Sequence, residues 1–388
     1  MFGPRIHLLT VWGIPIGFDL SWLVIVVLIT WSLAEGLFAN LHVHPTIDEA
    51  QAEAMREAVG MRWLLGLLGA LGLFLSVVLH ELGHAKVAER FGVPMAGITL
   101  FIFGGVAEMT REPPSAKAEF WVAIGGPLVT VALAFVGAVA VVVMGMADAG
   151  VGPSVLVGWL TLINVVLLVF NMIPAFPLDG GRVLRSIIWA ASGDLHKATR
   201  ITSAIGSGFG MFLMVFAVVQ LLFGNVIGAI WMFLIGMFLR AAAQMSYQRL
   251  VARRALEGER LDRFMKTDPI TLTPDLPLDR VVDDYLYRYH YKMFPVVEQN
   301  DRLVGCLTIE QIKDVPREQW PVTYVRDVLQ TCGPNNTIAR DKDPLDALTA
   351  MTQDNRTRLM VLDGDRLVGV IAMKDLMEFL SLKIELEP

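Results

Sequence analysis

The amino-acid sequence predicts a polytopic α-helical membrane protein with a short re-entrant β element, followed by a C-terminal soluble α/β domain. Three observations support this fold class. The 388 residues are 54% hydrophobic and only 18% charged, with a mean hydropathy of +0.55, which is too apolar for an ordinary soluble domain. Long apolar stretches recur up to about residue 250, and an internal repeat follows them.

Six stretches are long and apolar enough to cross a hydrocarbon core, which needs about 20 residues. They cover residues 18–38, 63–84, 120–146, 154–174, 203–223 and 225–245. The start of the chain does not resemble a cleavable signal peptide, because Pro4 and Pro15 interrupt it and a basic segment followed by an apolar core is missing. We therefore expect the first span to stay in the mature protein.

The loops between these spans predict the orientation, since Lys and Arg accumulate on the cytoplasmic side. The basic residues lie between spans two and three, between spans four and five, and after span six: Lys86, Arg90, Arg111, Lys117, Arg182, Arg185, Lys197, Arg200, Arg240, Arg249, Arg253 and Arg254. The loops 147–154 and 223–225 contain no Lys or Arg. We expect a multi-pass protein of the plasma membrane with both termini and the soluble domain in the cytoplasm.

The second span ends in VLHELGH, residues 78–84, which combines two histidines and a glutamate. On a helix, His80 and His84 lie one turn apart on one face, as two ligands of a single Zn²⁺ require. Glu81 would then project beside the metal. Ionisable side chains inside a span are costly and mark functional sites. The alternative interpretation is that all three groups lie at the solvated end of the span.

The segment MAGITLFIFGGVAEM, residues 95–109, follows this helix and predicts a re-entrant β-hairpin. Its β-branched and aromatic residues favour strands, and Gly104 and Gly105 permit a close backbone approach. An open strand edge beside Phe103 could bind an extended substrate by strand addition. The alternative is an ordinary interfacial loop with two turn glycines.

A third metal ligand is expected, because catalytic zinc sites usually have three protein ligands and one open position. The stretch FNMIPAFPLDGG, residues 170–181, closes the fourth span with Asn171, Pro174 and Pro177, which break a helix. Irregular backbone at membrane depth is tolerated where it is buried in protein or lines a wet cavity. We expect an irregular segment to carry Asp179 to the histidine pair; a polar turn leaving the membrane is the alternative.

The two stretches together resemble the site-2 protease family of intramembrane zinc metalloproteases, peptidase family M50. The match consists of HELGH at 80–84 and N-x-x-P-x-x-x-L-D-G at 171–180, and the resemblance covers roughly 1–250. Gly125, Gly126 and Pro127 also resemble a family element, although Thr130 stands where an asparagine is common.

This resemblance implies a zinc-dependent endopeptidase that cleaves transmembrane segments of single-span membrane proteins in regulated intramembrane proteolysis. It implies one Zn²⁺ per chain held by His80, His84 and Asp179. Glu81 would be the general base, and Asn171 would help to bind the oxyanion. The Gly104–Gly105 pair resembles one at the substrate-binding strand of the family.

After a charged linker at 251–262, an internal repeat begins. DRLVGCLTIEQI (301–312) and DRLVGVIAMKDL (365–376) align at an offset of 64 residues, and an amphipathic helix and an apolar strand precede each of them. This pattern resembles a tandem pair of CBS domains, with repeats at about 263–318 and 324–382 in a domain that spans 263–388. The resemblance suggests a regulatory module and favours a homodimer, since such pairs often associate.

CBS pairs commonly bind adenine nucleotides through a hydroxyl residue and an aspartate three positions later. Each repeat keeps half of this signature, because Thr308 is followed by Gln311 and Ala372 by Asp375. Two interpretations stay open. One is a nucleotide site that uses Thr308 and Asp375, and the other is a docking or dimerisation module without a ligand.

The net charge and the cysteine content indicate what kind of partner and compartment to expect. The formal net charge of -6 gives no sign of a nucleic-acid partner. Cys306 and Cys332 are the only cysteines, and both fall in the tail, so we expect a reducing compartment and no disulfide.

Two other functions remain to be weighed against the protease. A CBS-regulated transporter or channel would place charges in several spans or repeat an inverted topology, and neither pattern is found. A catalytically silent family member is the other alternative, although all five positions implied for catalysis are intact.

Overall fold

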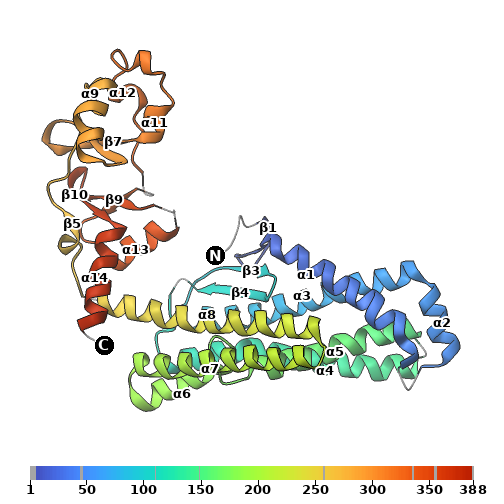
Figure 1. The fold of residues 1–388 in the computed structure, drawn as a ribbon. Helices are drawn as coiled ribbons and strands as arrows, with labels where there is room; N and C mark the ends of the chain where they lie inside the picture. The colour runs from blue at the N-terminus through green and yellow to red at the C-terminus, as the bar shows by residue number, and fades with distance from the viewer. Residues whose placement is uncertain are drawn as a thin grey trace. The chain divides into compact units, whose positions relative to one another are not determined.

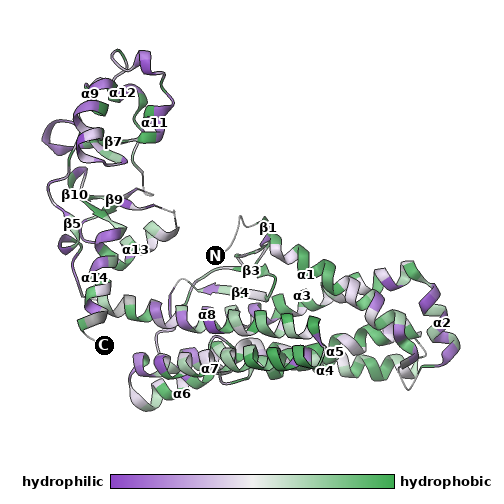
Figure 2. Cartoon of the chain, in the orientation of Figure 1, coloured by the Kyte–Doolittle hydropathy of each residue, from purple (hydrophilic) through white to green (hydrophobic). Residues whose placement is uncertain are grey.

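The computed structural model describes residues 6–43, 47–109, 111–147, 149–256, 258–333, 336–353 and 356–386. The chain divides into two compact units, Met1–Gln248 and Arg249–Pro388, which we describe separately (Figure 1). Figure 2 shows that the helices of the first unit are mostly apolar, whereas polar and apolar residues are mixed throughout the second.

The first unit is a helical bundle. Its helices are α1 (Leu20–Trp31), the π and 3-10 segments η1 (Ser32–Leu37) and η2 (Phe38–Val43), α2 (Glu49–Glu57), α3 (Val59–Arg90), α4 (Ala116–Met146), α5 (Val151–Asn171), α6 (Asp179–Ser192), α7 (Leu195–Leu222) and α8 (Val226–Leu256). Among the described residues, six helical segments are long and apolar enough to cross a membrane, which confirms the predicted number. Asp19, Ser115 and Asp194 cap α1, α4 and α7 by accepting backbone N–H groups.

A four-stranded sheet accompanies the bundle, with strand order β1-β2-β3-β4. Its strands are β1 (Ile6–Val11), β2 (Ile14–Phe18), β3 (Met95–Phe101) and β4 (Gly104–Met109). The predicted hairpin is present as the antiparallel pair β3–β4, which leaves β4 at one edge of the sheet. The pair β1–β2 was not expected, because Pro15 and the neighbouring glycines were interpreted as interruptions.

Two residues explain why the N-terminal segment forms a hairpin. Trp12 and Gly13 connect β1 to β2 with φ angles of 51° and 80°. Positive φ at both central residues is the requirement of a type I′ turn, which matches the twist of paired strands. Strand β2 then pairs in parallel with β3, with Ile16 opposite Ile98, and this pairing connects the two hairpins.

The sheet packs on α3 through apolar side chains. Leu100 contacts the cluster that contains Phe74, and Ile98 contacts the cluster that contains Leu82. On the other side of the bundle, α4 packs against both α3 and α6. Helix α3 therefore lies between the sheet and α4, and α4 joins it to α6.

The second unit contains the predicted repeat. Its strands are β5 (Met265–Lys266), β6 (Met293–Val297), β7 (Leu303–Thr308), β8 (Thr337–Ala339), β9 (Arg358–Asp363) and β10 (Arg366–Ala372). Its helical segments are η3 (Leu261–Arg263), α9 (Leu278–Arg280), η4 (Val281–Leu286), α10 (Tyr287–Tyr289), η5 (Gln299–Asp301), α11 (Ile309–Lys313), η6 (Arg317–Gln319), α12 (Val325–Val328), α13 (Pro344–Gln353) and α14 (Met373–Leu386). Each repeat has its own core, around Phe294 and Leu307 in the first and around Leu359 and Ile371 in the second.

Candidate metal centre

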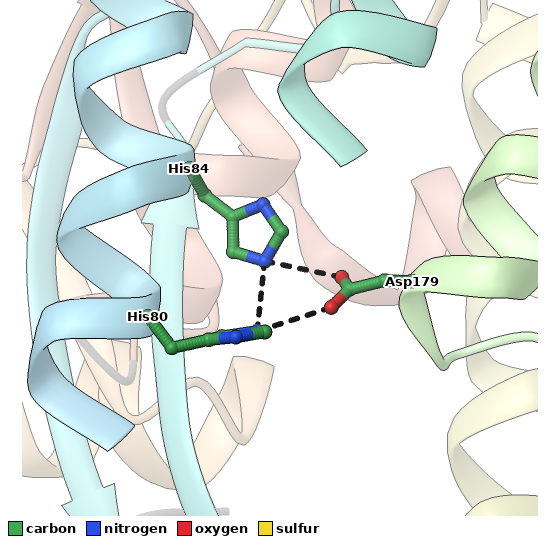
Figure 3. A group of neighbouring side chains, drawn as sticks. All are labelled: His80, His84 and Asp179. Atoms are coloured by element: carbon green, nitrogen blue, oxygen red, sulfur yellow. Dashed lines mark hydrogen bonds and ion pairs between the residues drawn. The ribbon is translucent and has the colours of Figure 1, made fainter. Parts of the chain in front are cut away.

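Three predicted ligands from two distant parts of the chain meet at one point. His80 and His84 lie one turn apart on α3, and Asp179 is the first residue of α6 (Figure 3). The Nε2 atoms of the two histidines are 3.1 Å apart, and they lie 3.1 Å and 3.2 Å from the two carboxylate oxygens of Asp179. All three residues are buried, with at most 9% of their surface exposed.

The opposite nitrogen of each imidazole is held by a group from α4. Nδ1 of His84 donates to the carbonyl oxygen of Val122 at 2.6 Å. Nδ1 of His80 donates to Oγ1 of Thr130 at 2.8 Å, and that hydroxyl donates in turn to the carbonyl oxygen of Gly126 at 3.4 Å. With the proton on each Nδ1, the tautomer that the contacts with Val122 and Thr130 favour, both Nε2 atoms present a lone pair toward Asp179.

This donor set fits a zinc ion. Two imidazole lone pairs and a carboxylate repel one another at this distance unless a cation lies among them. Zinc bonds to N and O ligands of 2.0–2.1 Å require ligand atoms about 3.3 Å apart in a tetrahedral site, close to the separations of 3.1–3.2 Å observed here. A histidine whose other nitrogen is hydrogen-bonded is also the usual form of a zinc ligand.

Space for an ion depends on a glycine of α4. A Cβ built on Gly126 would lie 2.6 Å from Nε2 of His80 and even closer to Nε2 of His84. Helices α3 and α4 also cross in backbone contact, because a Cβ on Gly83 would lie 2.6 Å from the carbonyl oxygen of Gly125. Small residues at both positions thus bring the helices together and keep the volume between the imidazoles open.

Glu81 lies beside the three candidate ligands. Its charge interacts with His84, His80 and Asp179. Its Cγ would lie 3.2 Å from a Cβ built on Gly105. The side chain of Glu81 on α3 therefore passes close to strand β4. Because Gly105 has no side chain, the backbone of β4 can approach Glu81.

The predicted substrate-binding residues occupy the turn and start of the edge strand. Gly104 has a φ of 130°, which favours glycine. The ring of Phe103 is 37% exposed and stacks on Phe238 of α8, with ring centroids 4.8 Å apart. At the other end of β4, Nη2 of Arg182 lies 3.7 Å from Sδ of Met109. The strand thus runs past Glu81 from α8 to α6.

The approach to Asp179 differs from the prediction in one respect. Helix α5 ends at Asn171, and the irregular segment covers only 172–178. Asp179 itself is the first residue of helix α6, whereas the expectation placed it on the irregular segment. Asn171 is half-buried at the end of α5, and in the described part of the chain it makes no hydrogen bond to the histidines or Asp179.

The two predicted nucleotide-binding residues lie at helix starts in the second unit. Thr308 caps α11, and Oε1 of Gln311 accepts the backbone N–H of Thr308 at 2.6 Å. The residue that stands in place of the signature aspartate is therefore used for a capping box. Asp375 lies in the first turn of α14, and its buried Oδ2 has no hydrogen-bond partner among the described residues.

Some residues at the site were missed or given another role. Gly126 was noted only for its resemblance to a family element, and the pairing of Glu119 with Arg185 was not expected. Glu119 is fully buried. Because it stands close to the predicted start of the third span, its charge could have been recognised, but a sequence does not identify a partner 66 residues away.

Comparison with known proteins agrees with these motifs. The model of peptidase family M50 matches residues 68–147 and 140–217, and the CBS domain model matches 261–318 and 325–382. The chain is similar to the protein Rip3 of Mycobacterium tuberculosis, with 31% identity over 366 residues, which is 94% of this chain and 89% of Rip3. It is also similar to a zinc metalloprotease of Methanocaldococcus jannaschii, with 34% identity over 318 residues, 81% of this chain and 86% of that one.

Among solved structures, a site-2 protease from Methanocaldococcus jannaschii is similar to this chain, with 30% identity and a TM-score of 0.41. The similarity covers 62% of this chain and 94% of that one. The family models and the relatives that align over most of their length identify the chain as a member of the M50, or site-2 protease, family of membrane zinc metalloproteases, with a pair of CBS domains at its C-terminal end.

Proposed function

We propose that this protein cleaves peptide bonds within or next to the transmembrane helices of single-span membrane proteins, in regulated intramembrane proteolysis. One observation carries the proposal. Two histidines of a membrane-spanning helix and an aspartate of α6 converge at separations suited to one zinc ion, and Glu81 follows the first histidine on the same helix. A buried polar group of this kind is costly in a membrane, so a role in chemistry explains its presence.

The roles of the residues follow from their chemistry. His80, His84 and Asp179 would hold the ion, which activates water and polarises a carbonyl group when it is bound. Glu81 would accept a proton from the attacking water and pass it to the leaving amine. Asn171 would donate its side-chain N–H to the carbonyl oxygen of the substrate as that oxygen gains negative charge.

The substrate would be presented as an extended strand. A helix hides its peptide bonds, because each N–H and C=O is already paired along the helix. We infer that the substrate unwinds locally and pairs with the outer edge of β4, where no other described strand of the chain is paired. Gly104, Gly105 and Phe103 would form the start of this binding edge, close to Glu81.

The CBS pair would regulate the protease from the cytoplasm, or would join two chains as a dimer. The basic loops between the spans support a cytoplasmic location for both termini. Of the two candidate nucleotide-binding residues, Asp375 has a carboxylate oxygen without a hydrogen-bond partner in the described part of the chain, whereas Gln311, three residues after Thr308, is engaged with the backbone of Thr308. We therefore place a bound adenine nucleotide at Asp375 first.

The protease proposal is tested with purified full-length protein in proteoliposomes together with single-span test proteins. We expect zinc-dependent fragments whose ends, determined by mass spectrometry, lie within or next to the transmembrane helix. Glu81→Gln should produce them at least about 100-fold more slowly. Cleavage confined to soluble loops, or fragments that Glu81→Gln forms at the wild-type rate, would contradict the proposal.

The nucleotide proposal is tested separately by calorimetric titration of the full-length protein with ATP and with AMP. We expect binding that Asp375→Asn weakens, with Asp365→Asn, which removes an exposed carboxylate of the same unit, as the matched control. If neither nucleotide binds the wild-type protein at millimolar concentration, the CBS pair is a docking or dimerisation module.

A further inference from the structure

A buried ion pair connects the two helices that organise the candidate metal centre. Glu119 of α4 is 0% exposed and Arg185 of α6 is 6% exposed. Nε and Nη2 of Arg185 both donate to Oε1 of Glu119. The other carboxylate oxygen, Oε2, has no hydrogen-bond partner within the described part of the chain. The carboxylate of Glu119 is therefore bound through Oε1 to Arg185.

Each member of the pair lies close to groups that determine the geometry of the metal centre. Glu119 precedes Val122 by about one helical turn, and the carbonyl of Val122 holds the imidazole of His84. Arg185 follows Asp179 by about two turns on α6. The ion pair therefore connects the helix that orients the histidines to the helix that begins with the third ligand.

Arg185 also contacts the segment that leads into Asp179. Its guanidinium lies over the ring of Phe176, 5.3 Å from the ring centroid. The same segment is packed tightly against the first turn of α6, because a Cβ on Gly181 would overlap the backbone of Ala175 and Phe176. Arg185, a residue of α6, thus contacts both α4 and the irregular segment 172–178.

We propose that Glu119 and Arg185 are positioning residues that fix Asp179 at bonding distance from a metal ion held by His80 and His84. The proposal rests on the metal centre described above. The pair touches neither the ion nor a substrate, and it acts through the helices that carry the ligands.

A buried ion pair is better suited to positioning the metal ligands than to merely holding α4 and α6 together. Apolar residues of similar volume hold helices together at least as well as a buried ion pair does. Two charge-assisted hydrogen bonds to one carboxylate oxygen differ from apolar packing because they are directional and restrict the separation of the two helices at this point. That property matters for a metal centre whose ligands come from two helices, since a ligand shifted by a fraction of a bond length binds less tightly.

The test is zinc affinity, measured by chelator competition on full-length protein in detergent. We expect Glu119→Gln to weaken zinc binding by about 10- to 100-fold, the usual effect of losing a group that orients a ligand. Glu35→Gln is the matched control. Glu35 pairs with buried Arg62 at 3.5 Å, about five turns of α3 away from His80, so its loss should leave zinc affinity unchanged.

A purely structural role makes a different prediction. In that case Glu119→Gln would lower the unfolding temperature of the metal-free protein, while the folded protein would bind zinc as tightly as Glu35→Gln does. This result would overturn the proposal. If Glu119→Gln does not fold, Glu119→Asp keeps the charge but shortens the reach, and it should still weaken zinc binding; unchanged affinity in that variant would also overturn the proposal.

Asp179→Ala separates this proposal from the one on which it rests. If wild type and Asp179→Ala bind zinc equally well, the metal centre itself is wrong, and the positioning role falls with it. If Asp179→Ala loses zinc affinity but Glu119→Gln and Glu119→Asp do not, the metal centre stands and only the positioning role is wrong.

Discussion

The two units of this chain use their polar residues in different ways. In the membrane unit, His80, His84 and Asp179 are buried and face one another. In the CBS unit, Thr308 and Gln311 stand at signature positions, but they bond to each other in a capping box on a half-buried helix. Among apolar helices a buried polar group needs a partner such as a metal ion, whereas near water the same kinds of residue can satisfy local backbone groups.

The largest effect on cleavage at an unchanged zinc content is expected for Glu81, which neighbours the candidate ligands. Glu81→Gln removes the carboxylate that would move the proton, so the cleavage rate should fall by about 10²- to 10⁴-fold. Zinc content should remain that of the wild type, because the amide is the same size and the ligands are intact. Kinetics on a single-span substrate together with elemental analysis measure both; loss of zinc would mean that Glu81 is itself a ligand.

Gly126→Ala should abolish zinc binding without removing any donor atom. The new Cβ would lie 2.6 Å from Nε2 of His80, in the volume that an ion needs. Gly145→Ala in the same helix is the control, because a Cβ there has no atom within 4 Å. Elemental analysis of both variants measures the difference, and normal zinc content in Gly126→Ala would show that the ion lies elsewhere.

Thr130→Val should reduce zinc affinity by about tenfold, because the hydroxyl that accepts the Nδ1 proton of His80 is lost. Thr161→Val provides a matched control. The hydroxyl of Thr161 donates to the carbonyl oxygen of Val157 in its own helix, so zinc affinity should not change. Chelator competition distinguishes the two; equal affinities would mean that Thr130 does not orient the ligand.

The smallest effect is expected in the CBS unit. Gln311→Ala removes one half of the capping box at Thr308, which should destabilise this unit by about 1 kcal/mol. Zinc content and cleavage of a test substrate without nucleotide should stay at the wild-type level. Chemical denaturation and the cleavage assay measure these quantities. Loss of cleavage would contradict the view that Gln311 has only a local structural role in the CBS unit.

Much of the candidate metal centre could be predicted from sequence, because two of its candidate ligands are close together in the chain and their spacing is that of one helical turn. The spacing of His80 and His84 matches one helical turn, and the apolar span around them marks these groups as unusual. Asp179 was proposed from the helix-breaking residues that precede it, and the resemblance to a family with both motifs supported that choice, although no spacing rule connects it to residue 80. The repeat in the second unit was equally visible, since it depends on sequence similarity within the chain.

Features that depend on long-range or backbone geometry were missed. The partnership of Glu119 with Arg185 requires α4 and α6 to pack, and the volume kept open by Gly126 exists only once α3 and α4 cross. The hairpin at Trp12 and Gly13 needs two residues with positive φ, and tryptophan gives little indication of such a turn. Each of these features is a property of packing between elements or of unusual backbone angles.

The most direct test of the account is the zinc content of the purified full-length protein, compared with Asp179→Ala and Glu81→Gln. We predict about one zinc per chain in the wild type, as a catalytic three-ligand site implies, a clear loss in Asp179→Ala, and full retention in Glu81→Gln. A wild-type protein that contains no zinc and takes up none, or an Asp179→Ala variant that keeps its zinc, would contradict the claim that the two distant motifs form one metal centre.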